Sequence, residues 1–136
     1  MTPFDLAQRF VGEVHELPGE HADHPLIQWW LSLCGYGFEA HDEVPWCSAF
    51  VNGICWECRL PRSKSAAARS WLQIGEAINL DDATAGYCIA VLSRGMNPAQ
   101  GHVGFYAGTE RLDQTYIRLV SGNALPLSYK PDGSAI

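Results

Sequence analysis

Hydrophobic positions near the start of the chain recur at the spacing of an amphipathic helix. Over residues 3–15, apolar side chains return every three or four positions, which places them on one helical face. Thr2 is a suitable N-cap, Pro3 fits the first helical position, and Asp5 follows the cap by three residues. The pattern predicts a first helix from Pro3 to His15, followed by a polar turn.

Two further segments have helical patterns that end in glycine. Pro25 opens an apolar run over residues 26–34 that Gly35 closes, and this run predicts a helix that is buried nearly all round. Residues 63–72 predict another helix, with Gly75 as its C-terminal cap.

Between these two segments, a helix is predicted to start at Pro45, whose missing N–H costs nothing in a first turn. Its apolar positions recur at spacings of three and four, so it has one apolar face. These positions are Phe50, Val51, Ile54 and Cys58. The helix is expected to end near Arg59, before Pro61.

After residue 85 the pattern changes to that of β-strands. β-Branched and aromatic residues are concentrated in three runs, residues 86–93, 101–108 and 116–121. Alternating apolar residues at positions 125, 127 and 129 predict a short last strand. Helices followed by strands predict an α+β fold, with N-terminal helices packed on a small antiparallel sheet, in a single domain over residues 1–136.

The composition and charge of the chain argue against some classes of function. The chain has 136 residues, of which 47% are hydrophobic and 18% charged, as in one globular domain. Its net charge is −6 and no basic stripe is present for a phosphate backbone, so nucleic-acid binding is not expected. No apolar stretch is long enough to span a bilayer. The first residues also lack the features of a signal peptide, so synthesis in the cytoplasm is expected.

The cysteines and histidines do not form a recognisable metal or disulfide framework. Five cysteines are an odd number, and without a signal peptide they argue against structural disulfides. Cys55 and Cys58 have CxxC spacing, but no second pair completes a zinc site. His21 and His24 have HxxH spacing, but no third ligand is evident. We therefore expect no metal and no cofactor.

Cys47 is the candidate nucleophile. It falls in the first turn of its helix, where free backbone N–H groups and the positive end of the helix dipole gather. A thiol so placed is expected to have a lowered pKa and to be more often thiolate at neutral pH. The alternative is a buried structural cysteine. Asp42 and Glu43 suit the positive helix end but oppose thiolate formation, so we give them no catalytic role.

His102 is the candidate base for this nucleophile. It opens an apolar strand, and Gly101 and Gly104 beside it leave space for another backbone or a ligand. A buried imidazole needs a polar partner, which Cys47 would supply. The alternative is a histidine whose hydrogen bonds are only structural.

Asn123 is the candidate third residue. Its side-chain carbonyl would accept the N–H of the second ring nitrogen of His102 and fix the orientation of the ring. The alternative is turn chemistry, because Gly-Asn is common in turns. A cysteine at a helix start, a histidine on a strand and an asparagine after a neighbouring strand follow the chain order of papain-like enzymes.

Four segments resemble a papain-like family of cell-wall hydrolases in the NlpC/CHAP superfamily, which includes many phage endolysins. Residues 42–52, DEVPWCSAFVN, resemble its specific D-E-x-P-W-C-[SA]-A-F-V-N signature. Residues 101–106, GHVGFY, resemble its G-H-V-G-F-[YF] motif, and residues 65–72, SAAARSWL, resemble its A-x-A-R-S-W-L segment. Residues 16–25, which begin ELPG and end in His-Pro, resemble its E-x-P-G…N-P-x-I start.

The resemblance implies cleavage of an amide bond in the peptide part of peptidoglycan. Cys47 would be the nucleophile, His102 the general base and then acid, and Asn123 the orienting residue. Trp46 and Ser48, which flank the cysteine, are expected to contact the substrate. Peptidoglycan is the expected partner of a monomeric enzyme that acts on the wall after release from the cytoplasm of the host cell.

The chain departs from the family pattern at two places. Residues 121–124 read SGNA where the family often has G-G-N-Q, and the chain ends without the family's V-L-G-[VY]-R strand. A phage or prophage endolysin is the first hypothesis. A secreted antibacterial amidase effector with the same chemistry and a catalytically inert wall-binding module are the alternatives.

Overall fold

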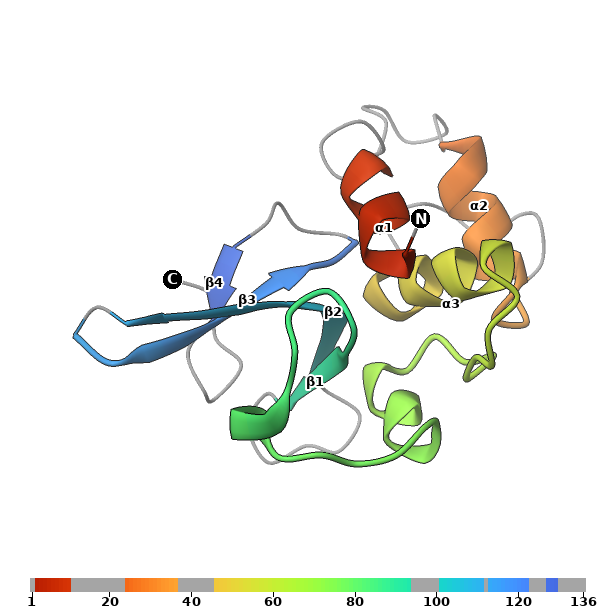
Figure 1. The fold of residues 1–136 in the computed structure, drawn as a ribbon. Coiled ribbons are helices and arrows are strands. Elements are labelled where there is room, and N and C mark those ends of the chain that lie inside the picture. The colour runs from red at the N-terminus through yellow and green to blue at the C-terminus, as the bar shows by residue number, and fades with distance from the viewer. Residues whose placement is uncertain are drawn as a thin grey trace.

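The computed structural model describes most of the chain. The described residues are 2–10, 24–36, 46–93, 101–111, 113–122 and 127–129. They form helices α1 (Pro3–Phe10), α2 (Pro25–Ser32) and α3 (Cys47–Glu57), the 3-10 helices η1 (Ala68–Gln73) and η2 (Leu80–Asp82), and strands β1 (Ile89–Ser93), β2 (Gly101–Arg111), β3 (Thr115–Val120) and β4 (Leu127–Tyr129). Helices come first and strands follow, so the predicted α+β class is confirmed (Figure 1).

The local signals at the helix ends act as predicted. The Thr2 hydroxyl accepts the backbone N–H of Asp5 at 3.1 Å, and the Asp5 carboxylate accepts the backbone N–H of Thr2 at 2.9 Å. This reciprocal pair satisfies two donors at the start of α1. After α2, Gly35 adopts a φ of 93°, the left-handed conformation that favours glycine at the end of a helix. The remainder of the first predicted helix, beyond residue 10, lies outside the described residues.

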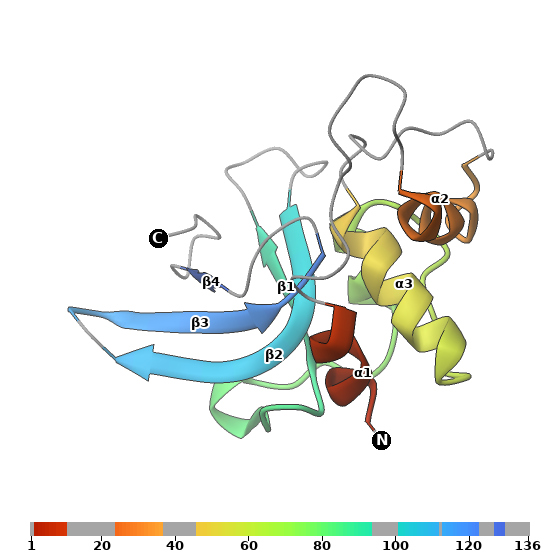
Figure 2. The same cartoon turned by 90° about the horizontal axis from the view of Figure 1, so that it is seen from above.

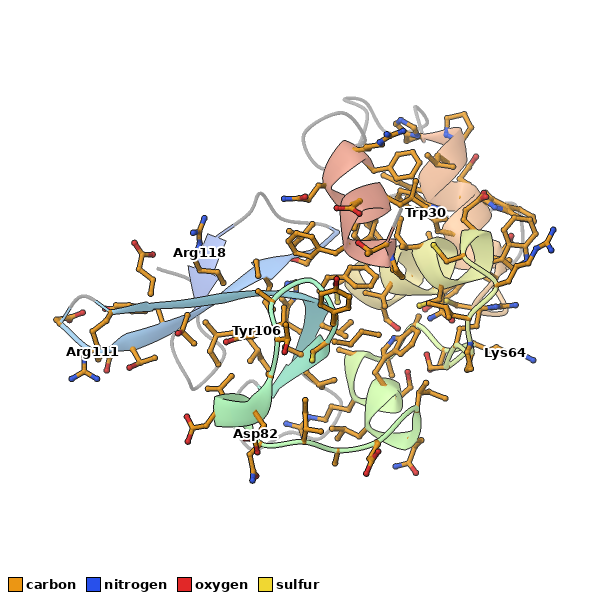
Figure 3. All side chains as sticks on the ribbon, in the orientation of Figure 1. Trp30, Lys64, Asp82, Tyr106, Arg111 and Arg118 are labelled. Carbon is orange, nitrogen blue, oxygen red and sulfur yellow. The ribbon has the colours of Figure 1, made fainter. Side chains whose placement is uncertain are left out.

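Helix α3 lies at the centre of the hydrophobic core. Every residue from Cys47 to Cys55 is buried, whereas the sequence predicts a single apolar face. The reason is that α1, α2 and β2 all pack against it. The core cluster also includes Trp30 and Phe50, whose rings meet edge to face with centroids 5.3 Å apart. Figure 3 shows Trp30 among the three helices.

The four strands form one antiparallel sheet in the order β1-β2-β3-β4. Leu92 of β1 lies opposite His102 of β2, and Phe105 of β2 lies opposite Val120 of β3. The inner half of β2 packs against α3, so the sheet and the helices share one core. In Figures 1 and 2, the helices gather beside one end of the β2–β3 pair.

Strand β2 has an inner and an outer half. Residues 102–106 are buried, whereas residues 109–111 are exposed. The pairing register with β3 shifts between Tyr106 and Thr109, and Gly108 has a φ of 107° that a glycine adopts without strain. We call the described part of β2 and β3 beyond this shift, residues 109–111 and 113–117, the outer ribbon. It points away from the helices, with Arg111 near its tip (Figures 2 and 3).

The predicted helix over residues 63–72 differs most from the structure. Its second half forms the short 3-10 helix η1, while residues 63–67 have no regular helix. Lys64 adopts a φ of 58°, which an α-helix does not allow. Gly75, with a φ of 76°, still ends the segment as predicted. Strand β1 starts three residues later than the run that predicts it, and β2 extends three residues further.

Replacing Gly53 by alanine should destabilise the domain, although alanine is the better helix former by about 1 kcal/mol. A Cβ atom on Gly53 would collide with the indole ring of Trp30 at Cδ1 and Nε1. Overpacking of this kind costs about 1 to 3 kcal/mol, which exceeds the gain in helix propensity. Urea unfolding followed by circular dichroism should give a lower midpoint. The decrease in midpoint caused by Gly53→Ala should be smaller in a Trp30→Phe background. A higher midpoint for Gly53→Ala alone would contradict the predicted collision with Trp30.

No helix among the described residues has the length and apolar character needed to cross a membrane.

Candidate active site

The first turn of α3 presents Cys47. The helix begins at this residue, with Trp46 as its N-cap, and the first helical hydrogen bond runs from the Phe50 N–H to the Trp46 carbonyl at 2.9 Å. The sequence prediction that Cys47 occupies the first turn is therefore confirmed. Cys47 is 8% exposed, which places it at the edge of the core. It lies in the turn whose backbone N–H groups have no acceptor within the helix.

Polar side chains on α3 fix the segment that follows the helix. The Ser48 hydroxyl donates to the Ser65 carbonyl at 2.6 Å and accepts the indole N–H of Trp71 at 2.9 Å. The Asn52 side-chain carbonyl accepts the backbone N–H of Lys64 at 2.8 Å. These bonds hold residues 63–65 against α3 and place η1 beside its first turn.

The 3-10 helix η1 also contacts the start of β2. A Cβ atom placed on Gly101 would lie 3.4 Å from Cγ of Arg69 and 3.6 Å from Cβ of Ala68. The residue after Gly101 is His102, which is 4% exposed. Thus η1 connects the strand that carries the candidate base with the helix that carries the candidate nucleophile.

The end of β3 closes the site from the other direction. Nε2 of His102 lies 2.9 Å from Oγ of Ser121, and both side chains are buried. A Cβ atom placed on the next residue, Gly122, would lie 2.5 Å from Cβ of Phe50 and 2.7 Å from the Trp46 ring. The chain after β3 therefore touches His102 on one side and the start of α3 on the other.

These contacts form a closed ring. It runs from the first turn of α3 through η1 to the start of β2, and then through the end of β3 back to α3. Cys47 and His102 both lie on this ring, which we call the Cys47–His102 corner. Asn123, Asp42 and Glu43 lie outside the described residues, so the expectation for Asn123 stays a prediction.

The two residues expected to contact substrate are buried. Ser48 has no exposed surface, and its hydroxyl is bound to Ser65 and Trp71. Trp46 is 4% exposed and packs against the rings of Trp30 and Phe50, with centroids 6.0 Å and 6.5 Å away. These contacts hold the first turn of α3 in place. The expectation that Trp46 and Ser48 contact substrate stays a prediction.

Ser121 is the residue at this corner that sequence reasoning did not select. A signal for it existed, because Gly104 on the neighbouring strand leaves room for its side chain. A Cβ atom on Gly104 would lie 2.8 Å from Cβ of Ser121. That glycine was noted only as a site of close approach, without a partner.

The other buried cysteine of α3 is chemically different from an activated thiol. Burial raises the pKa of Cys55 to about 12, with a smaller contribution from the neighbouring Cys58. Burial also raises the pKa of Cys34 to about 11. Both thiols are therefore protonated at neutral pH and are poor nucleophiles.

His24 has a local role in the structure. Its Nδ1 accepts the backbone N–H of Leu26 at 3.1 Å, so its side chain caps α2. This bond occupies one ring nitrogen of the HxxH pair, and its partner His21 lies outside the described residues. Within the described ranges, no three side chains of His, Cys, Asp or Glu gather to hold a metal ion.

An open hollow lies at the opposite end of α3 from Cys47. Its volume is about 530 Å³. The lining residues are Trp56, Glu57, Arg59, Leu60 and Arg62. Because none of them belongs to the Cys47–His102 corner, this hollow adds no group to the candidate chemistry.

Searches of family models, of curated proteins and of solved structures found no match to this chain.

Proposed function

We propose that this domain is a papain-like cysteine hydrolase of the NlpC/CHAP type that cleaves an amide bond in the peptide part of peptidoglycan. The observation that carries the proposal is the ring of contacts joining the Cys47 helix to the His102 strand. A helix that presents a cysteine at its start, packed against a sheet that carries a histidine, is the arrangement that a papain-like reaction requires. The motifs around both residues add the expected substrate class.

The chemistry begins with proton transfer from the Cys47 thiol to the imidazole of His102. The thiolate then attacks the amide carbonyl carbon and forms a tetrahedral oxyanion. N–H groups in the first turn of a helix have no acceptor within the helix, and those of α3 are the proposed donors to this oxyanion. His102 returns the proton to the leaving amine, and a thioester on Cys47 remains. Water, deprotonated by His102, then attacks the thioester carbonyl carbon. The C–S bond breaks, the acid is released, and the Cys47 sulfur takes the proton back from His102.

The burial of the corner supports this chemistry. Cys47 is 8% exposed and His102 is 4% exposed, so charges that form there are poorly screened by water. The dipole of α3 favours negative charge at its first turn, which is where the thiolate and then the oxyanion form.

The test is to incubate the purified protein with purified peptidoglycan and to identify the products by mass spectrometry. Cleavage between the glycan and L-alanine should release intact peptides, whereas cleavage within the peptide should release peptide fragments. In both cases the glycan chain stays whole. Wall material that binds the protein but yields no fragment would instead support the inert binding module.

We further propose that the biological setting is lysis by a phage or prophage endolysin. An antibacterial effector would use the same residues on the same bond. Deletion of the gene from a phage or prophage genome that carries it should delay host lysis. Unchanged lysis would favour the effector hypothesis.

A further inference from the structure

The hydrogen bond between His102 and Ser121 is a buried polar contact within an apolar region. Nε2 and Oγ lie 2.9 Å apart, and the two residues are 4% and 1% exposed. Their neighbours along the strands, Val103 and Val120, belong to the hydrophobic core. Burying two polar groups there is unfavourable unless they bond to each other, so this contact fixes both side chains.

The geometry of the sheet explains how these side chains meet. Phe105 pairs with Val120, so the next positions toward the corner are Gly104 on β2 and Ser121 after β3. His102 and Gly104 are two residues apart and therefore share one face of β2. A Cβ atom on Gly104 would lie only 2.8 Å from Cβ of Ser121. Because glycine leaves that space open, Ser121 reaches diagonally across the strands to the imidazole.

We propose that Ser121 is the positioning residue for His102, and that its hydroxyl oxygen accepts the Nε2–H of the imidazole. This inference rests on the proposed function, since it assigns the partner of the catalytic base. The bond places the proton of the neutral ring on Nε2, so the lone pair that takes the Cys47 proton is on Nδ1. After that transfer the imidazolium still donates its Nε2–H to Ser121, and the bond becomes charge-assisted.

A hydroxyl differs from the side-chain carbonyl expected to act at Asn123, because its oxygen can donate as well as accept. If Ser121 donated its proton to Nε2, the ring would carry its proton on Nδ1 and could not accept one from Cys47 there. The position of the ring proton therefore separates a positioning bond from a merely structural one. The elements packed around His102 also bring Cys47 of α3 and Arg69 of η1 to this corner, so the Ser121 variants are compared with both of these residues unchanged.

The first test reads the ring proton directly in Cys47→Ala, which cannot form a thiolate. Long-range ¹H–¹⁵N correlation spectra at a pH above the imidazole titration should show the His102 proton on Nε2. A proton on Nδ1 would overturn the proposal. Because this measurement needs no substrate, it is independent of whether the protein cleaves peptidoglycan.

The second test follows alkylation of Cys47 by iodoacetamide as a function of pH. Ser121→Ala should lower the alkylation rate at neutral pH by about 10- to 100-fold, the value of a hydrogen bond to a charged group, and should move the midpoint to higher pH. Ser121→Cys keeps a side chain of similar shape, but its sulfur is a poor hydrogen-bond acceptor, so this variant should behave like Ser121→Ala. It replaces the alanine variant in the test if that variant does not fold. Alkylation of Cys55, followed in the same samples, reports any general opening of the fold.

Asn123→Ala tests the other candidate partner of the ring through the same two measurements, the position of the ring proton and the alkylation profile. If Asn123→Ala changes them and the Ser121 variants do not, the proposal is wrong and Asn123 holds the ring. If the Ser121 variants behave as expected but the wild type releases nothing from peptidoglycan, the positioning role stands and only the proposed function fails.

Discussion

Replacing Cys47 by alanine should abolish release of peptidoglycan fragments, with a loss of at least about a thousandfold in initial rate. The change removes the only atom on the corner that forms the proposed covalent bond to substrate. It also removes little volume from a residue at the core edge, so the fold should be retained. The measurement is the initial rate of fragment release, with circular dichroism to confirm that the variant is folded.

Cys55→Ala is the matched control for this prediction. Both residues are buried cysteines of α3, but the pKa of Cys55 is raised to about 12. Its replacement should lower stability through lost packing while leaving the rate per folded molecule close to that of the wild type. Equal losses in the two variants would point to a shared structural cause. Full activity of Cys47→Ala would exclude the cysteine mechanism.

Replacing His102 by alanine should be as damaging as replacing Cys47, because the two side chains act as a unit. Without the imidazole, the Cys47 proton has no base and the leaving amine has no acid. The double variant Cys47→Ala/His102→Ala should therefore be no slower than either single variant. Alkylation of Cys47 in His102→Ala should also fall at neutral pH, since the thiolate loses its cation.

His24→Ala is the matched control for the histidine. The His24 ring accepts one backbone N–H at the start of α2, so its loss should cost about 1 kcal/mol of stability, as for other N-caps. It should leave the rate of fragment release and the alkylation profile of Cys47 unchanged. A normal rate in His102→Ala, or a further loss in the double variant, would show that His102 and Cys47 do not work together.

Local sequence signals were sufficient to predict most of the helices and strands. The Thr2–Asp5 capping pair and the terminal glycines Gly35 and Gly75 act over a few residues, so a single sequence predicts them. The strand runs likewise predict the four strands to within a few residues, and the last strand is found where apolar residues alternate.

The segment over residues 63–72 was mispredicted because its conformation depends on distant side chains. Its alanine content favours a helix, but Ser48 and Asn52 of α3 bind its backbone at Ser65 and Lys64. Hydrogen bonds between residues that far apart leave no periodic signal in the sequence. Tertiary contacts of this kind override local helix propensity.

The candidate site was predictable for the residues whose chemistry depends on a single element. Cys47 at a helix start and His102 at a strand start are visible in the sequence, and both lie on the Cys47–His102 corner. The roles of Trp46 and Ser48 required knowledge of what surrounds them, since proximity to the nucleophile does not reveal burial. Ser121 required the strand register, because its contact with His102 runs diagonally across two strands.

The division of β2 also has a consequence for how the molecule opens. Residues 109–111, 113 and 114 of the outer ribbon are exposed, whereas residues 102–106 are buried in the half of β2 that packs against α3. Segments with few buried contacts open at a lower free-energy cost than the whole domain. Amide hydrogens of the outer ribbon should therefore exchange with solvent through local fraying, while those near His102 exchange only when the core unfolds. The corner that carries the proposed chemistry thus belongs to the last part of the molecule to open.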